Sequence, residues 1–191
     1  MKQNTRPSSP SLTPPVMDAD AINRALRRIA HEIVERNPEL SLVVLAGIPS
    51  RGVEIARRLA GIIESLGKTA IGTGVIDVSM HRDDVGKRAE LPRVQASSLP
   101  LPLENKTVII VDDVFFTGRT ARAAMDAISS FGRPARIQLA ALIDRGHREL
   151  PIRVDYVGKN LPTAPGERVR LRLEDVDGEP DAVWLIKEEK A

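Results

Sequence analysis

One stretch of the 191-residue sequence, Val108-Ile-Ile-Val-Asp-Asp-Val-Phe-Phe-Thr-Gly-Arg-Thr120, combines the features of a buried strand, a ligand site and a helix start. Its first four residues are continuously apolar, which is typical of a strand covered on both faces of a parallel sheet. Two adjacent acids, Asp112 and Asp113, follow where that strand would end. Open α/β sheets bind ligands at the carboxyl ends of their strands, so the stretch predicts an α/β fold with a ligand site at these acids.

The chemistry of the same stretch points to a phosphorylated sugar. Ionised carboxylates offer only acceptors and therefore suit ribose hydroxyls. Thr117-Gly-Arg-Thr120 begins a predicted helix, whose free N–H groups attract phosphate, and Gly118 permits close backbone approach. A 5-phosphoribose carries both groups. The alternative is a plain strand–turn–helix connection in which the Thr-Gly pair only caps the helix.

Strands and helices alternate along most of the chain. Helices are expected from an N-cap at Asp18 to about Asn37, and at residues 53–66, with Gly67 as C-cap, and 119–131. Strands are expected at residues 42–46, 70–78, 107–111 and 136–143. This order predicts an α/β fold with a central, mostly parallel sheet flanked by helices on both faces. Short strands at 154–157, 169–173 and 182–186, with a hairpin turn at Asp177-Gly178, predict a small β-rich appendage.

The expected organisation is a single domain of residues 17–191 that follows a disordered, proline-rich tail of residues 1–16. Residues 78–104 are polar and irregular, and a loop of that length in a small domain is usually functional or mobile. Residues 153–191 hold most of the β-rich segment.

Composition limits the possible classes of protein. The chain has no cysteine, which excludes disulfides and thiolate chemistry and is compatible with a cytoplasmic location. No apolar run is long enough for a membrane span, and no export signal is visible. The formal net charge is only +2, so any anion-binding face must be local.

The stretch at 108–120 resembles the signature by which type I phosphoribosyltransferases bind 5-phosphoribosyl-1-pyrophosphate (PRPP). Residues 25–37, 144–153 and 155–163 resemble the PyrR family, which comprises bifunctional pyrimidine-operon regulators and uracil phosphoribosyltransferases. The resemblance implies the type I phosphoribosyltransferase fold with a small β-rich hood. It also implies that uracil and PRPP react to give UMP and pyrophosphate, with Mg²⁺ as cofactor, and that the chain forms a homo-oligomer, a dimer or larger.

The resemblance assigns roles to particular residues. Catalytic roles fall to Arg51, Arg82, Asp112 and Asp113, and the two acids would also hold Mg²⁺ directly or through water. PRPP and nucleotide binding is expected from Ser50, Arg51, Asp112, Asp113, Val114, Phe115, Phe116, Thr117, Gly118, Arg119, Thr120 and Arg145.

Two further loops resemble parts of such a site. Residues 47–52 resemble the pyrophosphate loop, in which a non-proline cis peptide is expected at Ser50-Arg51; the alternative is an ordinary turn with a surface arginine. The family more often shows Lys-Thr-Arg-Gly there, so Pro49 and Ser50 depart from its pattern. The segment that begins His81-Arg82 resembles a loop that closes over PRPP, with Lys87 or Arg88 in support; the alternative is a solvated run of charges.

Phe116 bears on the choice of base. Related purine transferases carry an aspartate immediately before the Thr-Gly pair, where it serves the purine ring, whereas the PyrR family usually has tyrosine. Phenylalanine can neither donate nor accept a proton. The resemblance together with this residue therefore favours a pyrimidine.

The same resemblance implies binding to pyrimidine-operon leader mRNA, favoured by the uridine nucleotides UMP and UTP. The implied RNA-binding residues are Arg27, Arg28, His31, Arg36, His147, Arg148, Arg153, Lys159 and Thr163. Arginines on a helix can instead form a solvated face or ion pairs. Two alternatives stay open: an RNA-binding regulator with feeble enzyme activity, and a phosphoribosyltransferase for another base with no RNA role.

Overall fold

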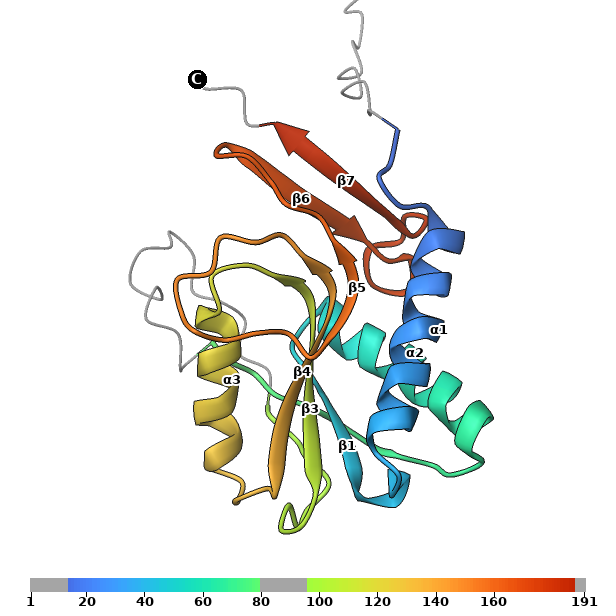
Figure 1. The fold of residues 1–191 in the computed structure, drawn as a ribbon, viewed down its shortest axis with the longest axis vertical. Coiled ribbons are helices and arrows are strands. Elements are labelled where there is room, and N and C mark those ends of the chain that lie inside the picture. The colour runs from blue at the N-terminus through green and yellow to red at the C-terminus, as the bar shows by residue number, and fades with distance from the viewer. Residues whose placement is uncertain (1–13, 80–95, 188–191) are drawn as a thin grey trace, which may run out of the picture.

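A five-stranded parallel sheet forms the centre of the computed structural model, which describes residues 14–79 and 96–187 (Figure 1). Its strand order is β2-β1-β3-β4-β5, and all four pairings are parallel. The bounds are β1 Val43–Gly47, β2 Gly72–Val75, β3 Thr107–Phe115, β4 Arg136–Asp144 and β5 Tyr156–Asn160. The predicted parallel sheet is confirmed, with β3 in the middle, longer than expected, and β2 shorter.

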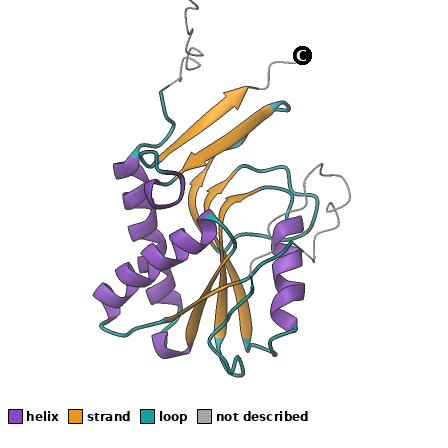
Figure 2. Cartoon of the chain, turned by 180° about the vertical axis from the view of Figure 1, so that it is seen from behind, coloured by secondary structure: helices purple, strands orange, loops and turns teal. Residues whose placement is uncertain are grey.

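Helices cover both faces of this sheet, as expected. Helices α1 (Ala19–Arg36) and α2 (Arg51–Gly67) lie on one face and α3 (Arg119–Ser129) lies on the other (Figures 1 and 2). The Asp18 carboxylate accepts a hydrogen bond of 2.8 Å from Ala21 N, which confirms the predicted N-cap. None of the helices in the described part of the chain is long and apolar enough to span a membrane.

The ends of α2 differ from the prediction. The helix begins at Arg51, two residues early, and its left-handed C-cap is Lys68 rather than Gly67. A Cβ atom at Gly67 would lie 2.4 Å from Leu40 Cδ1, so the Leu40 side chain would have to move to admit one.

Alternating side chains of the strands build two separate cores. Val43 and Leu45 of β1 pack with α1 and α2, whereas Val44 and Ala46 pack on the side of α3. Successive residues of a strand point to opposite faces, so a strand covered on both faces must be apolar throughout. This explains the continuous apolar runs of the sequence.

The hood, residues 167–187, forms a second sheet beside the carboxyl end of the first (Figure 1). Strands β6 (Glu167–Arg172) and β7 (Ala182–Lys187) pair antiparallel. The predicted hairpin turn at Asp177-Gly178 is wrong, because these residues end a helical turn, α4 (Glu174–Asp177), closed by Asp177 N donating to Leu173 O at 2.7 Å. Val16, placed in the tail by the sequence, donates to Val183 O of β7 at 2.7 Å.

The described part of the predicted loop at 78–104 is anchored. Val75 and Ser98 form an antiparallel bridge, and Leu99 and Leu103 are buried in the core beneath α3. Residues 80–95 of that loop, which include the predicted site residue Arg82 with His81, Lys87 and Arg88, lie outside the described residues, as do residues 1–13 of the predicted tail.

Replacement of Gly52 by alanine should destabilise the fold. A Cβ atom there would lie 2.4 Å from Val111 O, where the first turn of α2 rests on β3. We expect Gly52→Ala to lower the free energy of unfolding by about 1–3 kcal/mol, as overpacking does. Gly61→Ala on the same helix meets nothing within 4 Å and should leave stability equal or higher by about 0.5–1 kcal/mol. Urea titrations measure both, and equal midpoints would contradict this account.

Candidate active site

Three chain segments meet at the carboxyl end of the sheet. The loop after β1 is fixed to β3 by Ile48 N, which donates to Val111 O at 2.9 Å. The segment after β4 is fixed to β3 by Arg145 N, which donates to Phe115 O at 3.1 Å. The end of β3 therefore organises its neighbours, and the hood lies beside this edge of the sheet (Figure 1).

The two acids of the signature stand at this edge. Asp112 is buried and Asp113 is partly exposed. Asp112 Oδ1 accepts from Asp113 N at 2.9 Å, and Asp113 Oδ1 accepts from Val114 N at 2.8 Å. These backbone bonds fix the two carboxylates, whose oxygens act only as acceptors when ionised.

The donor set at the strand end fits one magnesium ion bound together with substrate. Within residues 14–79 and 96–187, no three His, Cys, Asp or Glu side chains are grouped to hold a metal. Mg²⁺ in proteins commonly uses one or two carboxylates together with waters and substrate phosphates. Asp112 and Asp113 supply that number.

A cavity of about 280 Å³ opens beside the start of α3. Gly118, with φ of 91°, is the N-cap of the helix, and Arg119 N donates to Thr117 Oγ1 at 3.4 Å. The cavity is lined by Asp112, Val114, Phe115, Phe116, Thr117, Gly118, Arg119, Thr120, Ala121 and Glu149. The structure thus brings most of the predicted nucleotide-binding residues into one cavity. Glu149, which forms an ion pair of 2.8 Å with Arg119, was not predicted, and no local signal marks it.

Arg51, predicted to bind pyrophosphate, contacts the hood. Its Nε and Nη2 donate to the two carboxylate oxygens of Asp177 at 2.9 and 2.7 Å, and its Nη1 lies 3.8 Å from Asp113 Oδ2. The hydrogen bonds from Arg51 hold the pKa of the Asp177 carboxyl well below its usual range. The cis peptide lies at Pro49-Ser50, one residue before the predicted Ser50-Arg51 position.

Phe116, which is exposed, and Arg145, which is partly buried, stack against each other next to the cavity. The Arg145 guanidinium carbon lies 4.0 Å from the centre of the Phe116 ring, and the His147 ring meets Phe116 edge-on at 5.9 Å. Arg145 donates to Thr163 Oγ1 at 3.2 Å and to Glu167 O at 2.7 Å. Burial and the nearby Arg168 lower the pKa of Arg145. The arginine is therefore held by the hood.

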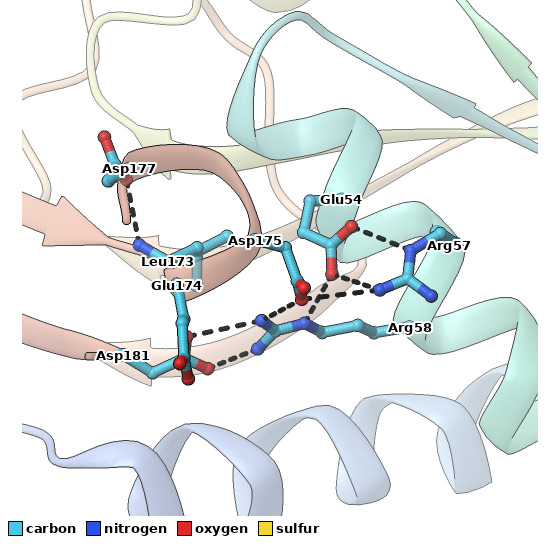
Figure 3. Close-up of polar contacts among 8 residues, drawn as sticks. All are labelled: Glu54, Arg57, Arg58, Leu173, Glu174, Asp175, Asp177 and Asp181. Carbon is cyan, nitrogen blue, oxygen red and sulfur yellow. Dashed lines mark hydrogen bonds and ion pairs between the residues drawn. The ribbon is translucent and has the colours of Figure 1, made fainter. Parts of the chain in front are cut away.

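A second group of ion pairs joins α2 to the hood (Figure 3). Arg58 donates to Glu54 at 2.7 Å, to Asp175 at 2.9 Å and to Asp181. Arg57 also binds Glu54, through two hydrogen bonds of 2.7 and 2.8 Å. These bonds, that from Arg57 foremost, outweigh burial and lower the pKa of Glu54 to about 2.

Comparison with known proteins identifies the family. A family model described as a phosphoribosyl transferase domain matches residues 16–174. The Bifunctional protein PyrR of Chloroflexus aurantiacus is 57% identical over 170 residues, which are 89% of this chain and 93% of that protein. The protein of the same name from Roseiflexus sp. is 52% identical over 172 residues, 90% and 94% of the two chains. The chain belongs to the PyrR family of phosphoribosyltransferases.

Solved structures confirm the fold. The HGPRT-ase of Leishmania tarentolae in complex with GMP superposes with a TM-score of 0.72 at 17% identity, covering 95% of this chain and 100% of that one. A hypoxanthine phosphoribosyltransferase of Staphylococcus aureus superposes with a TM-score of 0.64 at 21% identity, covering 83% of this chain and 81% of that one. At such identities the likeness concerns the fold alone, and it confirms the predicted type I phosphoribosyltransferase architecture.

Several residues that the PyrR resemblance assigned to RNA make contacts within the chain. Arg28 donates to Val157 O at 3.0 Å and to Gly158 O, which fixes α1 to β5. Arg36 donates to Asp155 O at 3.1 Å and lies over the Tyr156 ring. These contacts occupy part of each guanidinium and give both arginines a structural role.

The other residues of the set divide by exposure. Arg27, His31, His147, Arg148, Arg153 and Lys159 are exposed. Thr163 is 8% exposed and supports Arg145 and His147, so its burial argues against the direct RNA contact assigned to it. Lys159 and Arg28 line a groove of about 360 Å³ with Arg24, whereas Arg27 lines a separate groove between α1 and α2.

Glu54 should make stability depend on pH. Its pKa falls from an ordinary 4.5 to about 2 on folding, so the stabilisation is complete above pH 4.5 and is lost as pH falls toward 2. We expect Glu54→Gln to lower the free energy of unfolding by about 1–3 kcal/mol at pH 7, because it breaks charged hydrogen bonds. Urea titrations at several pH values should show this difference shrink in acid.

Glu64→Gln is the matched control, since Glu64 is an exposed glutamate of the same helix. Its stability should track the unaltered chain at every pH. A deficit for Glu54→Gln that stays constant from pH 7 to pH 2 would rule out the ion-pair explanation.

Proposed function

We propose that this phosphoribosyltransferase transfers the phosphoribosyl group of PRPP to uracil, giving UMP and pyrophosphate. The observation that carries the proposal is the cavity in which Asp112 adjoins the turn at the start of α3. Carboxylates that bind sugar hydroxyls and helix N–H groups that bind phosphate are what a 5-phosphoribose requires. The resemblance of 108–120 to the PRPP signature supports the same assignment.

Each group of the site has a role in this reaction. Asp112 and Asp113 accept hydrogen bonds from the ribose hydroxyls. Their negative charge stabilises the positive charge that the sugar gains as its C1–O bond breaks. The turn of residues 117–120 holds the 5-phosphate, while Ser50 and Arg51 bind the departing pyrophosphate. Bound Mg²⁺ would neutralise charge on the pyrophosphate, with the two acids as its protein ligands.

Phe116 and Arg145 favour a pyrimidine. Phe116 has no group that could exchange a proton with a purine ring, and its exposed ring offers an apolar surface to a small base. Arg145 covers part of this ring at 4.0 Å and is fixed by Thr163 and Glu167, which limits the room beside it.

Two substitutions test the enzymatic proposal. Asp112→Asn and Thr117→Ala should each lower kcat/KM by about 100-fold or more, because they remove groups that stabilise charge or hold phosphate in the transition state. Both should keep the thermal stability of the fold. Asp126→Asn, at an exposed acid of α3, should retain full activity. Near-normal kcat/KM in both site variants would refute the assignment.

A panel of bases tests the substrate. Uracil, orotate, hypoxanthine and adenine are each offered with PRPP and Mg²⁺, and the nucleotide product is identified by chromatography. We expect UMP alone. Turnover of only a purine would support the open alternative, a transferase for another base.

We propose a second function, regulation of pyrimidine genes by binding leader mRNA in the cytoplasm, favoured by uridine nucleotides. The supporting observation is that exposed cations lie on α1 and on the segments around β5, with Arg28 and Lys159 lining one groove. RNA phosphates bind such cations, with an affinity that falls as salt rises. We also propose that the chain forms a homo-oligomer, as the family resemblance implies. The alternative function, an RNA-binding regulator with feeble enzyme activity, stays open.

Substitution of the exposed cations tests RNA binding. Lys159→Gln and Arg153→Gln should each weaken binding to the leader stem-loop and lower the slope of log K against log salt by about one. Arg122→Gln, at an exposed cation of α3 outside the set, should bind normally. Gel shifts with and without UMP measure the effect. Equal affinity for a scrambled RNA would remove the regulatory proposal and leave the enzyme proposal intact.

A further inference from the structure

Arg51 is held by an acid that belongs to no sequence motif of the site. Asp177 of α4 binds it through both carboxylate oxygens, at 2.9 Å from Nε and 2.7 Å from Nη2. The Asp177 side chain is only 7% exposed, and it also accepts from Arg172 Nη1 at 2.7 Å and from Leu173 N at 2.9 Å. Two of its partners are in the hood, so its place is fixed independently of Arg51.

This contact determines which way the guanidinium points. Of its three nitrogens, Nε and Nη2 face Asp177, whereas Nη1 lies 3.8 Å from Asp113 Oδ2. The Nη1 donors are therefore turned toward the end of β3, where the reacting group would lie. A planar guanidinium bound on one edge in two places cannot rotate freely, so its other edge is oriented in advance.

We propose that Asp177 is a positioning residue that presents Arg51 to the pyrophosphate group of PRPP. The proposal rests on the proposed phosphoribosyltransferase function. In the unliganded protein the hood thereby fixes the anion-binding arginine, and binding loses less side-chain entropy than it would with a free arginine.

The second ion-pair group provides a matched comparison. Arg58 and Asp181 join the same two elements, α2 and the hood, through a similarly enclosed carboxylate with 8% of its side chain exposed. Arg58 lies two helical turns beyond Arg51, about 10 Å along α2. If Asp177 only attached the hood, its substitution and that of Asp181 should have the same effect on ligand binding. If Asp177 positions Arg51, only its own substitution should weaken ligand binding.

The test measures PRPP and pyrophosphate binding by calorimetry, with Mg²⁺ present, to the full chain. We expect Asp177→Asn to raise the Kd of both ligands about tenfold and Asp181→Asn to change neither by more than about twofold. In kinetics, Asp177→Asn should raise the KM for PRPP and leave the KM for the base unchanged. Equal effects of the two substitutions, or tighter PRPP binding by Asp177→Asn, would overturn the proposal.

A double substitution establishes the route of the effect. If Asp177 acts through Arg51, Asp177→Asn should add nothing to the loss caused by Arg51→Gln, whereas independent roles would give additive losses and overturn the proposal. If Asp177→Asn fails to fold, Asp177→Glu keeps the charge and moves the carboxylate by one methylene. It should still weaken PRPP binding several-fold, and unchanged binding would overturn the proposal.

Different results would disprove the proposed enzymatic function and the positioning role of Asp177. Absence of PRPP binding by the unaltered chain would remove the proposed function and the positioning role with it. Normal binding by the unaltered chain together with normal binding by the Asp177 variants would remove the positioning role alone.

Discussion

Strand β3 is buried on both faces, and this burial restricts the polar side chains of the site to the carboxyl-terminal part of the strand. Residues 108–111 are at most 1% exposed and lie between parallel neighbours on either side. A polar side chain within that run would lose its hydration without a partner. The first acids of β3, Asp112 and Asp113, come directly after this run and still within the strand, and the neighbouring loops attach beside them through backbone bonds to Val111 and Phe115.

The hood is held by two kinds of interaction with different consequences. Leu171, Leu173 and Val183 join the core beneath α1 and α2, and the burial of these apolar side chains favours attachment of the hood. The ion pairs of Arg51 and Arg58 fix the orientation of the hood relative to α2, because a paired guanidinium restricts geometry more than it lowers the free energy of folding. Apolar burial thus decides that the hood packs against the sheet, and the charged groups decide how it faces the end of β3.

The sequence predicted those features that depend on neighbouring residues. The order of strands and helices follows from local patterns and is confirmed. The phosphate-binding role of the turn at Thr117 stays a prediction, and the structure places a cavity beside it. Asp177 could not be predicted, because its partner Arg51 lies 126 residues away and its Asp-Gly pair resembles a hairpin turn. The same limit applies to Thr163, whose partners Arg145 and His147 lie 18 and 16 residues away in the sequence. The family resemblance assigned Arg28 and Arg36 to RNA, and the structure shows that they also tie α1 to the segment of β5.

Arg145 and His147 share two neighbours, Thr163 and Phe116. Thr163 accepts from Arg145 through its hydroxyl, and its carbonyl oxygen meets the ring of His147 at 2.5 Å. Phe116 touches both of these side chains, Arg145 over its face and His147 at its edge. A ligand that displaces Arg145 from the Phe116 ring must therefore disturb the loop that carries His147. These side-chain contacts join the end of β3 to the segment after β4, in addition to the backbone bond from Arg145 N to Phe115 O.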